Sequence, residues 1–123
     1  MIKKFDASVE RAKLPTESEV KEGMNAALAL FNKRWVLRIL WELRDGRRTT
    51  FRQLQQACAE LSSSVLNVRL SELRFAELIE HEAAQGYRLT VSGEDLLVAM
   101  RPLALWASKW HEHAVANMTG ATD

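Results

Sequence analysis

The sequence is poor in the residues that build disulfide-linked, loop-rich or membrane-spanning proteins. It has one cysteine, Cys58, which cannot form an internal disulfide or a thiolate metal cage. Two prolines and five glycines among 123 residues leave little room for a loop-rich fold. The longest apolar run spans the six residues 26–31, too few to cross a membrane. No apolar run follows Lys3 and Lys4, so we expect no secretory signal and a cytoplasmic protein without membrane association.

The most abundant residues favour helices. Leu and Ala together number 33, against 11 for Val and Ile, and β-branched residues are the ones that dominate strands. With 47% hydrophobic residues, the chain can build one packed core. We therefore predict one mostly helical domain over residues 16–118, preceded by a loose arm at 1–15 and followed by a frayed tail at 119–123.

Charge is segregated along the chain although the net charge is only +1. Residues 33–76 carry nine basic and four acidic side chains, whereas residues 77–123 carry three basic and seven acidic ones. Eight of the basic residues in the middle segment are arginines, which suit phosphate recognition. A solvated surface of mixed charge is the alternative explanation.

Capping residues predict where the helices begin. Thr16 with Glu19 forms a capping box before a helix with an apolar face that includes Met24, and a second helix over about 33–44 is apolar nearly all round. Gly46 can take the left-handed conformation that ends this second helix.

A third and a fourth helix follow. Thr50 and Gln53 form a further capping pair, and Ser62 caps a helix that ends near Ala76. Short strands at 78–82 and 87–90, joined by 83–86, read as a β-hairpin. A last helical region begins at Val91, and Pro102 is expected to kink or restart it.

Helices followed by a hairpin, with a short break between the last two helices, match the order of a winged helix-turn-helix. The local sequence is equally informative over KRWVLRILWELRDG at 33–46, FRQL at 51–54, SSSVL at 62–66, YRLTVSGEDL at 87–96 and LALW at 103–106. These segments, together with Arg69, Leu70 and Leu73, resemble the HxlR-type family of bacterial transcriptional regulators over roughly residues 20–113. MarR-type regulators resemble it more distantly. The fold class expected is mainly α (α+β), a winged helix-turn-helix with a short two-stranded wing and flanking dimerisation helices.

The sequence departs from the family pattern in four places. Glu77 stands where a glycine is expected, and the loop after Gly46 is one residue longer than usual. The wing carries Glu80 and Glu82 and has no basic residue at its tip, so we expect it to repel phosphate. Several family members sense oxidants through an N-terminal cysteine, but residues 1–57 contain none. Thiol sensing is therefore not expected, and Cys58 is predicted to be a small core side chain.

A helical wheel separates the two faces of the fourth helix. Leu66, Leu70 and Leu73 face the core, so Asn67 and Val68 lie on the opposite face, which the resemblance places in the major groove of DNA. Arginines near the start of the third helix are suited to phosphate. Arg69 lies nearer the core and is open either to phosphate or to pairing with a glutamate. The residues predicted to contact double-stranded DNA are Arg47, Arg48, Thr50, Arg52, Ser62, Ser63, Ser64, Asn67, Val68, Arg69 and Ser71.

The resemblance implies a homodimer acting on a pseudo-palindromic site, with an interface built from the first and last helices. The residues predicted for this interface are Met24, Leu28, Phe31, Leu103, Trp106 and Trp110. Two alternatives are a winged-helix protein-interaction module without DNA binding, and a regulator responsive to a small-molecule effector with a pocket near Trp106 and Trp110. No histidine or acid accompanies the serines at 62–64, so no enzymatic activity is expected, and no cofactor or metal site is predicted.

Overall fold

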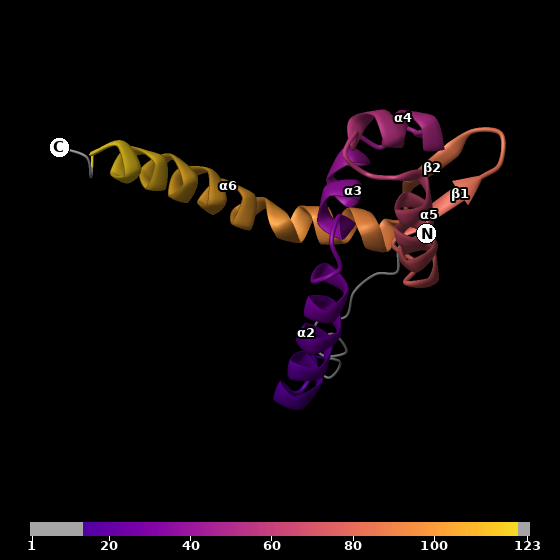
Figure 1. The fold of residues 1–123 in the computed structure, drawn as a ribbon. Helices are drawn as coiled ribbons and strands as arrows, with labels where there is room; N and C mark the ends of the chain where they lie inside the picture. Colours follow the sequence, from indigo (N-terminus) through magenta and orange to yellow (C-terminus); the bar gives the residue numbers. More distant parts are fainter. Residues whose placement is uncertain (1–13, 121–123) are drawn as a thin grey trace. The chain divides into compact units, whose positions relative to one another are not determined.

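The computed structural model describes residues 14–120, and the chain divides between Arg34 and Trp35 into two compact units, each described by itself. The first unit contains the helix α2 (Glu17–Phe31) (Figure 1). The elements of the second unit are α3 (Val36–Glu42), α4 (Phe51–Ala57), α5 (Ser63–Phe75), β1 (Ile79–Glu82), β2 (Gly86–Leu89) and α6 (Val91–Gly120). Most of the predicted arm, and residues 121–123 of the predicted tail, lie outside the described residues. The single domain over 16–118 stays a prediction.

The predicted helix starts at Thr16, Thr50 and Ser62 are confirmed by their hydrogen bonds. The hydroxyl of Thr16 accepts from the amide of Glu19 and the Glu19 carboxylate accepts from the amide of Thr16, which completes a capping box. Thr50 and Gln53 repeat this arrangement at α4, and the Ser62 hydroxyl accepts from the amide of Val65 at α5. Each cap satisfies amides that the first helical turn leaves unpaired.

The core of the second unit lies where α3, α4 and α5 converge on the small sheet. Its side chains are apolar and less than one-tenth exposed: Val36, Ile39, Leu40, Leu43, Leu54, Cys58, Leu61, Leu66, Leu70, Leu73, Ile79, Tyr87 and Leu89. Fully burying one such aliphatic side chain contributes about 1.5–3 kcal/mol. The core therefore holds the three short helices in one arrangement although two of them have only seven residues.

The predicted start of the second helix, near Lys33, is wrong by three residues. Trp35 has φ +80°, a left-handed conformation that cannot belong to a right-handed helix, so α3 begins at Val36. The helix ends at Glu42, and Gly46 at φ +83° takes the left-handed conformation that the sequence predicts for it.

The hairpin forms a two-stranded antiparallel sheet in which Ile79 pairs with Leu89 and Glu82 with Gly86, close to the predicted strands. The segment before α4 joins this sheet, because Thr49 and Tyr87 exchange two backbone hydrogen bonds of 2.8 Å. Gly86 has φ +105°, and a Cβ there would lie 2.5 Å from the Thr49 carbonyl oxygen. Only glycine therefore allows this close approach of the two backbones.

Pro102 does not restart the last helix, because α6 continues through it from Val91 to Gly120 (Figure 1); the expected kink stays a prediction. Pro102 has no N–H to donate to the Val98 carbonyl, so α6 forms with one backbone hydrogen bond fewer at this point. Residues 119 and 120, assigned to the tail from the sequence, are helical. Within residues 14–120, no helix combines the length and apolarity needed to cross a membrane.

Glu77 occupies a strained position between α5 and β1. Its φ of +62° lies in the left-handed region that favours glycine, the residue expected here from the family pattern. Its carbonyl accepts a 2.7 Å hydrogen bond from the Thr90 hydroxyl, which holds the turn against the start of α6. The turn is therefore fixed by its surroundings even though its residue type disfavours it.

Replacing Glu77 with glycine should raise the free energy of unfolding by up to ~1 kcal/mol, because relief of left-handed strain exceeds the added freedom of the unfolded chain. Glu77→Ala keeps the Cβ while removing the carboxylate, so it should give no such gain. Urea unfolding of the two variants and the parent measures the difference. Equal stability of the glycine and alanine variants would show that strain at this position costs nothing.

Candidate nucleic-acid interface

The outward face of α5 is set by three buried leucines on its other side. Leu66, Leu70 and Leu73 are each no more than 1% exposed, as the wheel predicts. Adjacent helical residues point about 100° apart, so Asn67 and Ser71 are turned to solvent and both are exposed. Among the described residues, nothing forms a hydrogen bond with the Asn67 side chain, which leaves its amide oxygen and nitrogen available to a ligand.

The serines at the start of α5 have structural partners as well as exposure. The Ser62 hydroxyl caps the helix and lies 3.3 Å from the Ser64 hydroxyl. The Ser63 hydroxyl accepts a 2.7 Å hydrogen bond from Gln55 of α4. Gln55 therefore links the two helices of the helix-turn-helix, a role that the capping and apolar patterns of the sequence do not reveal.

The side chain of Arg48, predicted to contact DNA, binds residues of the wing. Its side chain is 19% exposed, and its guanidinium lies 3.2 Å from the Glu82 carboxylate and 3.6 Å from that of Glu80. It also donates to the Gly86 carbonyl at 3.3 Å. A guanidinium held by two carboxylates and a carbonyl positions the hairpin, and a phosphate contact by Arg48 stays a prediction.

The same pairing changes the expected role of the acidic wing. Glu80 also accepts a 2.6 Å hydrogen bond from Arg88 on the facing strand. Beside this pair, the rings of His81 and Tyr87 stack with centroids 4.2 Å apart. Since Glu80 and Glu82 are offset by Arg48 and Arg88, they repel phosphate less than the sequence suggests.

Two arginines near the start of α4, Arg47 and Arg52, have exposed side chains. Arg52 is exposed and has no hydrogen-bond or ionic partner among the described residues. Arg47 is 83% exposed at its side chain and pairs with Asp45 at 3.0 Å. The backbone amide and then the side chain of Arg47 lower the pKa of the Asp45 carboxyl from its ordinary value. The Thr50 hydroxyl already accepts from the Gln53 amide, so its first role is to cap α4.

The side chain of Arg69 forms an ion pair within its own helix. Its guanidinium lies 2.9 Å from the Glu72 carboxylate, one turn along α5, and the side chain is 21% exposed. Of the choices left open by the sequence, this favours the pair with Glu72 over a free phosphate-binding cation.

Cys58 is buried at 2% exposure, as predicted, and the desolvation of its thiol raises the pKa of that group above its ordinary value. A raised pKa keeps the sulfur in the unreactive thiol form. Among residues 14–120, no three His, Cys, Asp or Glu side chains gather where they could hold a metal ion.

The residues predicted for a dimer interface are largely exposed in the single chain. On α2, Met24 and Leu28 are 53% and 51% exposed, and Phe31 is half-buried. On α6, Leu103, Trp106 and Trp110 are each more than half exposed. The two tryptophan rings stack on each other at 5.7 Å, so this apolar stripe is continuous.

Together, three short helices, a two-stranded hairpin and an exposed polar helix face define a winged helix-turn-helix protein. A model of the HxlR-like helix-turn-helix family matches residues 30–115, and the chain belongs to this family. The uncharacterized HTH-type transcriptional regulator YvaP of Bacillus subtilis is 28% identical over 100 residues, which cover 76% of this chain and 92% of YvaP. The fold and the family place this chain among the DNA-binding transcriptional regulators.

Solved structures agree with this assignment. The quinone-bound structure of YodB from Bacillus subtilis is similar with a TM-score of 0.66 and 30% identity, covering 71% of this chain and 96% of that one. A regulator assigned to the MarR family from Enterococcus faecalis shares the fold with a TM-score of 0.68 at 24% identity, covering 85% of this chain and 96% of that one. The resemblance seen in the sequence and the predicted fold class are thereby confirmed.

Arg48 and Arg52 are both predicted to bind phosphate, but changing each to glutamine should affect the stability of the fold differently. Arg48→Gln should lower the free energy of unfolding by about 1 kcal/mol, because Glu80 and Glu82 lose a partly buried partner. Arg52→Gln should leave it unchanged, since its exposed guanidinium has no such partner. Chemical unfolding of both variants checks this. An unchanged stability for Arg48→Gln would show that the wing does not depend on this arginine.

Proposed function

We propose that this member of the family is a sequence-specific regulator that binds a pseudo-palindromic DNA site as a homodimer. The observation that carries the proposal is the outward face of α5, where Asn67, Val68 and Ser71 are exposed beside a helix start capped by Ser62. A helix of this size fits the major groove, and in a helix-turn-helix the second helix of the motif is the one that enters it.

The residues on this face suit base edges. An asparagine amide can pair with both the N6 and N7 positions of adenine, and Val68, 50% exposed, offers a methyl surface to a thymine methyl. Ser64 and Ser71 add hydroxyls that reach either bases or phosphate. Since these side chains are small, the backbone of α5 can approach the groove closely.

Phosphate contacts follow from the residues that the fold leaves available. Arg52 and Arg47 lie at and before the start of α4, close in sequence to Thr50, and both are exposed. Such contacts fix the register of the protein on the duplex but carry no sequence information. Because Arg48 is held by Glu80 and Glu82, it acts mainly by fixing the hairpin next to this surface.

The proposed homodimer is supported by large apolar side chains that are exposed to solvent in the single chain. Leu103, Trp106 and Trp110 on α6, with Met24 and Leu28 on α2, are each at least half exposed. Large exposed apolar side chains gathered on one helix mark an interaction site in soluble proteins, and each of the two helices carries such a group. A two-fold dimer would present two copies of α5, which matches a pseudo-palindromic site.

Changing Asn67 to alanine should weaken binding to the cognate site by roughly 1–3 kcal/mol and leave binding to scrambled DNA nearly unchanged. Arg52→Gln should weaken both and lower the dependence of log K on log salt by about one unit. Fluorescence anisotropy with duplexes from upstream of the protein's own gene, at several salt concentrations, measures both effects.

Asn117→Ala, which removes an exposed amide near the end of α6, is the matched control for the asparagine substitution. Equal losses for Asn67→Ala on cognate and scrambled DNA would contradict base reading by this residue. If the parent discriminates no duplex at physiological salt, a protein-interaction module becomes the better account of the fold.

Light scattering of the parent should give about twice the mass of a 14.0 kDa chain, because the apolar stripe on α6 needs a partner. Trp110→Lys should shift the protein toward the monomer by burying a charge in that interface. Phe75→Lys is the control, since Phe75 is 91% exposed but lies outside the predicted interface. A monomeric parent, with or without DNA, would refute the dimer.

A further inference from the structure

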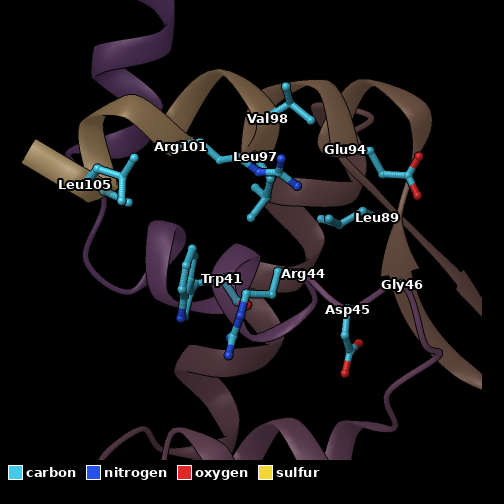
Figure 2. Close-up of a pocket in the computed structure, with 11 residues that line it drawn as sticks. Trp41, Arg44, Asp45, Gly46, Leu89, Glu94, Leu97, Val98, Arg101 and Leu105 are labelled. Atoms are coloured by element: carbon cyan, nitrogen blue, oxygen red, sulfur yellow. The ribbon is translucent and has the colours of Figure 1, made fainter.

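A cavity of about 660 Å³ lies between α3, the loop that follows it, β2 and the first half of α6. Leu89, Leu97 and Leu105 contribute apolar walls, and Trp41 faces them from α3 (Figure 2). A volume of this size falls within the range of small-molecule sites in proteins. The sequence suggests a pocket near Trp106 and Trp110; neither tryptophan lines this cavity, whose lining on α6 runs from Glu94 to Leu105.

Two guanidinium groups reach this apolar cavity. Arg101 has no hydrogen-bond or ionic partner among the described residues, and Figure 2 shows its side chain extending along α6 toward Leu97. The guanidinium of Arg44 lies 4.4 Å from the centre of the Trp41 ring and donates to the Trp41 carbonyl at 3.0 Å. Arg44 is therefore held in place by the ring while several of its N–H donors stay unused.

Acidic groups at the cavity restrict the charge of a ligand. Asp45 is already bound by the backbone and side chain of Arg47. Glu94 lies seven residues before Arg101 on α6, about 10 Å along the helix, at the other end of the lining. The lining therefore holds two guanidinium groups, one carboxylate already bound by Arg47 and one further carboxylate, a balance that suits a ligand with one negative charge better than two.

We propose that this cavity binds a small organic acid with one carboxylate on an apolar body of aromatic size. The carboxylate would pair with Arg101, because a planar guanidinium donates two parallel N–H hydrogen bonds to the two oxygens of a carboxylate. The body would lie against Trp41, Leu97 and Leu105, whose burial supplies the apolar part of the affinity. Ligand binding at this site does not depend on the DNA-binding proposal.

The test uses the full chain and no DNA, so its outcome is independent of operator recognition. Isothermal titration with 2-naphthoate should detect binding, and 2-naphthamide, which has the same body without the charge, should bind about tenfold more weakly. Arg101→Gln should lower the affinity for naphthoate by a similar factor. Lys109→Gln, which removes another exposed cation of α6 outside the cavity, should leave it unchanged.

A second variant tests the location without altering charge. Ala104 is an exposed residue of the lining, so Ala104→Trp should fill the cavity and abolish naphthoate binding while thermal unfolding shows the fold intact. The proposal is overturned if neither 2-naphthoate nor octanoate binds the parent at millimolar concentration, or if naphthamide binds equally well. It is also overturned if both Arg101→Gln and Ala104→Trp bind naphthoate as tightly as the parent. A change in the mass of Ala104→Trp in light scattering would overturn it too, because it would show that a second copy of the chain occupies the cavity.

Discussion

The burial of Leu66, Leu70 and Leu73 is the interaction on which the proposed function depends. Rotating α5 by one residue position, about 100°, would move Asn67 into the place of Leu66. Such a rotation would expose leucine side chains worth about 1.5–3 kcal/mol each and bury an amide without a partner. These costs are a large share of the stability of a small domain, so the core fixes which side chains meet a ligand.

Some arginines of the basic segment link elements of the fold, whereas others are exposed and available to a ligand. The sequence does not distinguish the two groups, but the structure does. Arg38 donates to the Glu42 carboxylate at 2.8 Å and to the Ala57 carbonyl at 2.9 Å, and therefore links α3 to the end of α4. Arg48 links the segment before α4 to the wing. Arg52 makes no such link among the described residues. The positive charge counted along the sequence thus overstates the charge available to DNA.

Local patterns predicted most of the fold because they act within a few residues. The pairs Thr16–Glu19 and Thr50–Gln53 marked their helices, since a capping box is complete within four positions. The partners of Arg48 could not be predicted in this way, because Glu80 and Glu82 lie more than 30 positions away in the sequence. The position of the cavity could not be predicted for the same reason. Trp41, Leu89 and Arg101 belong to three different elements, so no sequence pattern shows that they line one cavity.

The charge of the wing and its attachment to the rest of the fold determine how much the wing, compared with α5, can contribute to the proposed DNA binding. Glu80 and Glu82 belong to the acidic C-terminal segment, but they pair with Arg48 and Arg88, so the hairpin presents little net charge of either sign. A hairpin of this kind neither repels nor strongly attracts phosphate. Its position is nevertheless fixed by the backbone bonds between Thr49 and Tyr87. The wing therefore acts chiefly as a brace for the start of α4, which leaves the exposed face of α5 as the surface to which the proposed function assigns sequence recognition.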